Sequence, residues 1–301
     1  MNFFRHLFPS RELTLALGGG GARGNAHIGV LRVLEAEGYR IRAVAGTSAG
    51  GLVAVFYAAG FSPDEIERLF SQVNQEDLYG RSPQEGPALL GLAGAEKWLR
   101  QQLGNRTFAD LRLPCAVTAV DLNGRREIVI AEGDVVDALL ATIAVPGIFP
   151  PRPMGEMRLV DGGVLNPVPV SVARALAPGL PVVAVVLTPP LEAPIAPSIP
   201  GLNLPPLLVE PLRRLRFTQA MGIFLESVEI GSRALTQWRL EAEKPEVIIR
   251  PAVERIGLLQ KVNVHEVVRL GEEAARKALP ELRRASAPLR VFRPKVHAHV
   301  S

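Results

Sequence analysis

A serine framed by small residues is the first candidate for chemistry in this sequence. Ser48 stands at the centre of Gly-Thr-Ser-Ala-Gly, residues 46–50, which fits the pattern G-x-S-x-G. The apolar stretch 41–45 precedes it and a helical pattern follows it, so the serine is expected on a turn from a strand to a helix. Small neighbours permit a strained turn that lifts the hydroxyl clear of the sheet. Ser48 is therefore predicted to be a nucleophile rather than an ordinary serine at a helix start.

A glycine-rich stretch is the second candidate. Four successive glycines, residues 18–21, are followed by Ala-Arg-Gly and lie between the apolar stretch 13–17 and a helical pattern from Asn25. Backbone N–H groups at such a turn can bind an anion, either a phosphate or a transient oxyanion. The stretch also satisfies G-x-G-x-x-G, but a dinucleotide site needs an acidic residue about 20 positions further on. Residues 44–47 (Val-Ala-Gly-Thr) stand there instead, which disfavours a dinucleotide site.

No histidine is well placed to activate the serine. A nucleophilic serine needs a base, and in many hydrolases a histidine follows it on a loop. His297 and His299 lie in a basic tail, and His265 opens an amphipathic helix, where a surface or capping role is expected. His27 lies one turn into a helix, where packing is the expected role. A triad through His265 remains an alternative.

Asp161 is the third candidate and supplies the missing base. It follows the short strand 158–160 and precedes two glycines, 162–163. A carboxylate at a strand end without bulky neighbours can closely approach another residue at a strand end. Asp-Gly alone is typical of a simple turn, but the serine turn and the glycine-rich stretch together favour a catalytic role.

The three motifs together resemble the patatin-like phospholipase family, and among its members the small bacterial proteins related to the catalytic domain of neuropathy target esterase. The resemblance spans roughly residues 12–187 and also includes 26–31, 120–122, 144–151 and 166–169. It implies a three-layer α/β/α sandwich with a mostly parallel central sheet, and it implies neither a metal nor an organic cofactor. It further implies these roles: Ser48 as nucleophile, Asp161 as its base, Gly19, Gly20 and Gly21 as donors of oxyanion-hole amides, and Arg23 as the residue that braces or charges that loop.

The element pattern agrees with an α/β fold. Strand and helix signals alternate over the first hundred residues, which predicts a parallel sheet with helical crossovers. Helical spacing of Phe217, Met221, Phe224, Leu225 and Val228 predicts a core-facing helix. The other expected elements are a capping box at 62–65, a hairpin of 116–120 with 127–131, a helix at 135–144, strands at 182–187 and 247–249, and a final helix at 265–278.

One domain is expected over residues 1–301. Beyond the motif-bearing part lie a proline-rich loop, 188–206, a helical part, 207–282, and a basic tail, 283–301. The loop carries a single charge, which fits a loop packed on the body, a cap of the active site or a lipid-facing surface. We expect it to form part of an acyl pocket or its lid.

Composition limits the class of protein. A chain of 301 residues with 48% hydrophobic and 21% charged residues is not disordered as a whole. The net charge of +4 comes from the tail, because residues 1–282 sum to −1, so nucleic-acid binding is not expected. The single cysteine, Cys115, lies in an apolar stretch typical of a buried strand and allows no intrachain disulfide. The sequence carries no signal for an oligomeric state.

No apolar run reaches the roughly 18 residues that a membrane-spanning helix needs, and no signal-peptide pattern begins the chain. The expected location is the cytoplasm, with room for a peripheral contact at the inner membrane surface. The expected function is a serine hydrolase of lipid or lysophospholipid esters. An acyltransferase using the same serine and a catalytically silent lipid-binding or regulatory protein are the alternatives.

Overall fold

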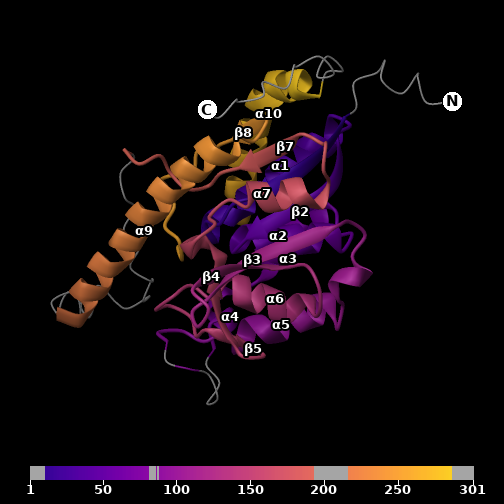
Figure 1. Cartoon of the computed structure of the whole chain (residues 1–301). Coiled ribbons are helices and arrows are strands. Elements are labelled where there is room, and N and C mark those ends of the chain that lie inside the picture. Colours follow the sequence, from indigo (N-terminus) through magenta and orange to yellow (C-terminus); the bar gives the residue numbers. More distant parts are fainter. Residues whose placement is uncertain (1–10, 81–85, 87, 193–215, 287–301) are drawn as a thin grey trace, which may run out of the picture.

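An eight-stranded mixed sheet forms the centre of the computed structural model, which describes residues 11–80, 86, 88–192 and 216–286 (Figure 1). The strand order is β5-β6-β3-β2-β1-β7-β8, and β4 pairs with β3. The strands are β1 (Glu12–Leu17), β2 (Arg40–Thr47), β3 (Cys115–Asp121), β4 (Arg126–Ile130), β5 (Arg152–Met154), β6 (Met157–Asp161), β7 (Val182–Val185) and β8 (Val247–Ile249).

The sheet is parallel from β3 to β8 and antiparallel where β4, β5 and β6 join it. Parallel strands end at the same edge of a sheet, so the turns after β1 and β2 lie side by side there. β3 extends beyond β2, and its last residues pair with the end of β6. This antiparallel pairing brings the carboxyl end of β6 close to the same edge.

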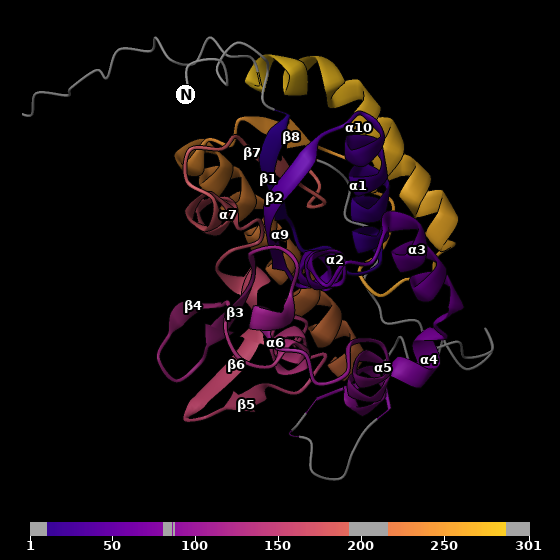
Figure 2. The ribbon, with the colours of Figure 1, turned by 90° about the vertical axis from the view of Figure 1, so that its right-hand side faces the viewer.

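The two faces of the sheet differ in side-chain size. Large residues such as Leu15, Leu17 and Val44 face one layer of helices. On the other face a row of alanines runs across four strands in register: Ala184, Ala16, Ala45 and Ala116. These small side chains let α7 (Val170–Leu176) pack closely on the sheet. Figure 2 shows α7 on the side opposite to α1 (Ala26–Ala36), α3 (Pro63–Gln72) and α10 (Val264–Ala285). The expected three-layer α/β/α architecture is confirmed.

Local sequence signals account for the helix boundaries. The capping box expected before α3 is present, with Ser62 and Glu65 each bonded to the backbone of the other residue. Gly38 adopts a φ of 75° just after α1, as glycines that end helices do. The other described helices are α2 (Ala49–Ala58), α4 (Gln75–Leu78), α5 (Ala93–Leu103), α6 (Val135–Thr142) and α9 (Arg216–Glu243), with short 3-10 turns at Gly21–Asn25, Phe108–Asp110 and Gly162–Val164.

The described part of the chain after residue 187, which carries no family motif, belongs to the same three layers. β8 pairs with β7, and α10 crosses α1 with their backbones in contact. A Cβ atom on Gly271 of α10 would lie 1.9 Å from the carbonyl oxygen of Ala26, and one on Gly29 of α1 would lie 2.0 Å from that of Val268. Only glycine permits this close approach.

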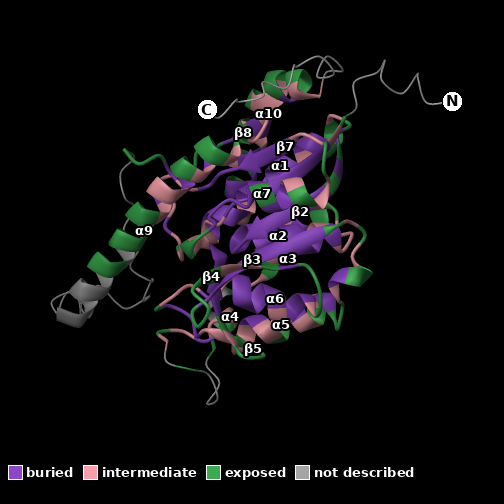
Figure 3. Cartoon of the chain, in the orientation of Figure 1, coloured by how far each residue is buried: buried purple, intermediate pink, exposed green. Residues whose placement is uncertain are grey.

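Helix α9 departs from the expectation that its apolar spacing marks a core-facing side. Phe224 and Val228 are 46% and 41% exposed, and Figure 3 shows further exposed positions along the helix. The side chains of Phe217, Met221 and Leu225 lie outside the described residues. The described helices include none that is both long and apolar enough to cross a bilayer.

Candidate active site

Ser48 occupies a strained turn between β2 and α2. Its φ of 55° and ψ of −124° lie in a region that non-glycine residues rarely adopt. The flanking glycines make this turn sterically feasible. A Cβ atom on Gly46 would lie 2.4 Å from the carbonyl oxygen of Gly50, and one on Gly50 would lie 2.2 Å from that of Leu17. The expected strand-to-helix turn is confirmed.

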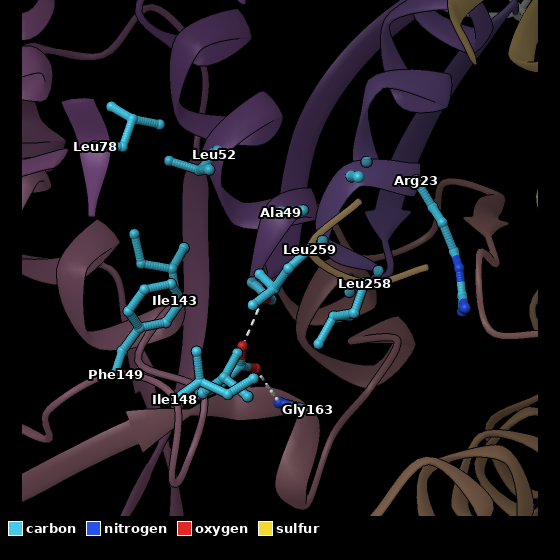
Figure 4. A pocket seen from close by; sticks show the side chains of 18 of the residues that line it. Arg23, Ala49, Leu52, Leu78, Ile143, Ile148, Phe149, Gly163, Leu258 and Leu259 are labelled. Carbon is cyan, nitrogen blue, oxygen red and sulfur yellow. Dashed lines mark hydrogen bonds between the residues drawn. The ribbon is translucent and has the colours of Figure 1, made fainter. Parts of the chain in front are cut away.

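Asp161 meets this serine through the register of three strands. Thr47, just before Ser48, pairs with Thr118 on β3, and the next residue of β3 pairs with Asp161. The Ser48 Oγ donates a hydrogen bond to Asp161 Oδ2 over 2.5 Å. Asp161 Oδ1 accepts a second bond, over 2.7 Å, from the Gly163 N–H. Both bonds are drawn in Figure 4.

Burial sets the electrostatics of this pair. Asp161 is 5% exposed and Ser48 is 7% exposed. Loss of hydration raises the pKa of Asp161 to about 6, against the opposing effects of its bonds from Ser48 and Gly163. A carboxylate with such a pKa is mostly ionised at neutral pH and is well matched to accept the serine proton. The arrangement can therefore supply a nucleophile and its base without a histidine.

The glycine-rich stretch passes directly beside the nucleophile. A Cβ atom on Gly19 would lie 3.3 Å from the Cβ of Ser48. The Gly19 N–H donates to the carbonyl oxygen of Pro167 over 2.9 Å, so this structure does not leave it free for an oxyanion. The N–H groups of Gly20 and Gly21 donate to no acceptor in the described ranges. Gly20 and Gly21 line the same cavity as Ser48, so their N–H groups are candidates for binding an oxyanion there.

Arg23 links the glycine-rich stretch to the C-terminal part of the chain. Its Nε donates to the carbonyl oxygen of Ile256 over 2.6 Å, and its Nη2 lies 3.4 Å from Glu229 on α9. Its side chain is almost fully buried, and Figure 4 shows it pointing away from the hydrogen-bonded pair beside Gly163. The Ala22 N–H bonds to Leu258 over 2.8 Å and adds to the same attachment. This geometry fits bracing of the loop rather than direct charge stabilisation.

Within the described residues, neither His27 nor His265 hydrogen-bonds Ser48 or Asp161. His27 is fully buried, and burial lowers its pKa to about 4, so its neutral ring donates from Nε2 to the carbonyl oxygen of Gly18 over 2.8 Å. His265 hydrogen-bonds Glu67 through Nδ1. Since Asp161 bonds Ser48 directly, neither described histidine stands between them. Cys115 is buried in β3, as expected.

A cavity of about 1000 Å³ opens from the serine. One wall is apolar and comes from the helices after β2: Leu52, Phe70, Leu78, Trp98, Ile143 and Phe149. The other wall comes from α9, the segment before α10 and the start of α10. We call it the polar wall because it carries the polar groups of Glu229, Ser232, Lys261, Asn263 and His265, which stand among apolar residues such as Phe224, Leu258 and Leu259. Figure 4 shows Leu52, Leu78, Ile143 and Phe149 on one side of the hydrogen-bonded pair and Leu258 and Leu259 on the other.

Several residues of the site were not anticipated from the sequence. Thr142 Oγ1 accepts the Ser48 N–H over 2.8 Å and holds the turn in place. Thr47 and Thr118 bond each other beneath the turn, with 2.7 Å between their hydroxyl oxygens. Of the proline-rich loop, Thr188 lines the cavity, whereas residues 193–206 lie outside the described residues. No local pattern marks these threonines, because their role depends on which strands and helices become neighbours.

Comparison with known proteins gives consistent matches. The profile of the family described as patatin-like phospholipase matches residues 15–174. An uncharacterized NTE family protein of Mycobacterium tuberculosis is 35% identical over 165 residues, which cover 54% of this chain and 45% of that protein. Another from the same organism is 30% identical over 278 residues, covering 89% of this chain and 46% of that protein. The chain therefore spans less than half the length of these relatives.

Among solved structures, VipD from Legionella pneumophila aligns with a TM-score of 0.57 at 12% identity. The alignment covers 91% of this chain and 67% of VipD. At this identity the match shows a shared fold.

Proposed function

The chain belongs to the patatin-like phospholipase family, and on this premise we propose that it is a serine hydrolase of lipid acyl esters, acting as a phospholipase, lysophospholipase or carboxylesterase. The 2.5 Å hydrogen bond from Ser48 to a buried Asp161, at the base of a largely apolar cavity, is the observation that carries the proposal. The Ser48 turn and the glycine-rich stretch support it.

The proposed reaction begins when Asp161 accepts the Ser48 proton as Oγ attacks the ester carbonyl carbon. The negative charge that develops on the carbonyl oxygen is stabilised by the N–H groups of Gly20 and Gly21, where one lost donor typically costs roughly 3–4 kcal/mol of barrier. The protonated Asp161 then gives its proton to the leaving alcohol, and an acyl ester on Ser48 remains. Asp161 next takes a proton from water as the water oxygen attacks this ester. When the bond between the acyl carbon and Oγ breaks, Asp161 returns the proton to Ser48 Oγ and the free acid leaves.

The two walls of the cavity orient the proposed substrate. The acyl chain lies against the apolar wall, because burial of methylene groups is favourable there. The alcohol portion lies toward the polar wall, where Lys261 and Asn263 are exposed. A lipid or lysophospholipid ester has this division into an apolar chain and a polar head. Access to such a substrate involves a peripheral contact with a lipid surface, and the cytoplasmic location expected from the sequence remains a prediction.

The test is fatty-acid release from a long-chain lysophosphatidylcholine, with product analysis in the presence and absence of an acceptor alcohol. Ser48→Ala is expected to lower the rate by about a thousandfold or more. Ser71→Ala is the matched control, because Ser71 lines the same cavity but bonds only the carbonyl oxygen of Arg68 in the described structure. Hydrolysis that survives in Ser48→Ala contradicts the proposal, and acyl transfer without free acid replaces it with an acyltransferase.

A further inference from the structure

One face of α9 is uncharged and largely apolar, and its residues are exposed apart from the half-buried Ala234 and Leu235. Two neighbouring rows at helical spacing make up this face, which we call the α9 stripe. Its residues are Ile223, Ser227, Ile230, Ala234 and Trp238 in one row and Phe224, Val228, Gly231 and Leu235 in the other. Ile223 and Trp238 are 66% and 67% exposed. Contiguous apolar surface of this kind marks interaction sites rather than ordinary protein surface.

The opposite face of α9 is fixed to the body. Arg233, Thr236 and Leu240 are buried there, one helical turn apart. Glu229 Oε1 lies 2.9 Å from Arg233 and 3.4 Å from Arg23, the arginine that braces the glycine-rich stretch. Rotation of the helix to bury the α9 stripe would break these buried ion pairs, which is costly. The stripe is therefore held outward.

The α9 stripe continues into the mouth of the catalytic cavity. Phe224, Val228 and Gly231 belong to the stripe and also line the cavity that holds Ser48. Whatever covers the stripe therefore lies against the entrance that the substrate uses. A lipid surface fits this position, because it is apolar below its headgroups and supplies the proposed substrate. Exposed tryptophan is also a residue that membrane interfaces favour.

We propose that the α9 stripe binds a lipid surface and places the mouth of the cavity against it. This inference rests on the proposed lipid-ester substrate. The stripe carries no charge, and residues 1–282 sum to −1, so binding through it depends on apolar contact rather than on attraction to anionic lipid. Binding to neutral vesicles is therefore the diagnostic property.

The test is flotation with vesicles of phosphatidylcholine alone, in a Ser48→Ala background that leaves the lipid intact. The double variant Ile223→Gln/Trp238→Gln is expected to partition about tenfold or more weakly than its parent, since two large apolar side chains lose their burial in lipid. The matched control is Val129→Gln/Ile248→Gln, which changes two exposed apolar residues on β4 and β8, outside the stripe. The control is expected to bind like its parent.

In the active protein, Ile223→Gln/Trp238→Gln is expected to hydrolyse a soluble short-chain ester at the parent rate and a vesicle-borne ester more slowly, because neither residue lines the cavity. Unchanged flotation of the double variant, or binding only to vesicles with anionic lipid, overturns the inference. Loss of a dimer on sedimentation with unchanged flotation assigns the stripe to a second copy instead. Flotation needs no hydrolysis, so its failure is distinct from failure of the proposed reaction.

Discussion

Among single residues, the proposed reaction depends most on Asp161, a buried carboxylate that must be ionised to accept a proton. Burial raises the pKa of Asp161 to about 6, above the usual aspartate value of about 3.9. Protonated Asp161 cannot accept the Ser48 proton. Activity is therefore present above pH 6 and lost as the pH falls through the pKa of the folded state.

We expect the kcat/KM for a soluble ester to fall on the acid side with an apparent pKa near 6, because this parameter reports the essential base of the free protein. The measurement is a pH–rate profile, with unfolding monitored at each pH to separate inactivation from titration. A rate that stays constant down to about pH 4 would show that a group with an ordinary carboxylate pKa, or no base at all, is involved.

We expect His27 to position the glycine-rich stretch through its hydrogen bond to Gly18. Its Nε2–H donates to the Gly18 carbonyl oxygen in a fully buried setting. His27→Leu leaves that oxygen unpaired and is expected to cost about 1–3 kcal/mol of stability. It is also expected to lower kcat more than it raises KM, because the amides of Gly20 and Gly21 shift.

His27→Gln is the matched variant, since its side-chain amide can donate to Gly18 in place of the imidazole. Partial recovery of kcat in His27→Gln relative to His27→Leu is the expected result. If kcat were equal in His27→Leu, His27→Gln and the parent, His27 would contribute only to packing and would not position the glycine-rich stretch. Chemical denaturation and steady-state kinetics supply both measurements.

At the scale of elements, the sequence predicted the parts whose signals are local. Strands followed by glycine turns and helices preceded by capping residues were found where expected, including the Ser48 turn and the box at Ser62. The side of α9 that faces the body was predicted wrongly, because apolar spacing marks one face of a helix but not what covers it. The hydrogen bond between Ala22 and Leu258 could not be predicted from the sequence either, because it joins segments that are far apart in the chain.

The crossing of α1 and α10 offers a test at this scale. Gly271→Ala would place a Cβ atom 1.9 Å from the carbonyl oxygen of Ala26, the first residue of α1 and a close neighbour of the glycine-rich stretch. We expect a loss of at least about 2 kcal/mol in the free energy of unfolding, together with reduced activity. Chemical denaturation measures the first and ester hydrolysis the second.

Gly231→Ala is the helical control, because nothing lies within 4 Å of an added Cβ atom there. Alanine favours a helix over glycine by up to about 1 kcal/mol, so this control is expected to be neutral or stabilising. A parent-like Gly271→Ala would mean that α10 does not pack on α1 as closely as the structure has it.

At the scale of the whole molecule, the site is assembled from two parts of the chain. The part that matches the family profile supplies Ser48, Asp161, the glycine-rich stretch and the apolar wall. The rest supplies the polar wall, α9 and the helix that packs on α1. Sequence motifs singled out Ser48, Asp161 and the glycine-rich stretch, because the glycines of these motifs meet steric requirements at fixed spacing. They did not indicate the residues of the apolar wall. The second part has no motif of this kind. Its residues contribute to the cavity and to the packing on α1 only after segments distant in the sequence have come together in the fold.

The central claim is that Ser48 is a nucleophile activated by Asp161. Its most direct test is labelling with a fluorophosphonate, with the adduct located by peptide mass spectrometry. We expect a single adduct on Ser48 in the parent, none in Ser48→Ala, and much slower labelling in Asp161→Asn. An unlabelled parent, an adduct on another residue, or equal labelling rates in the parent and Asp161→Asn would contradict the account.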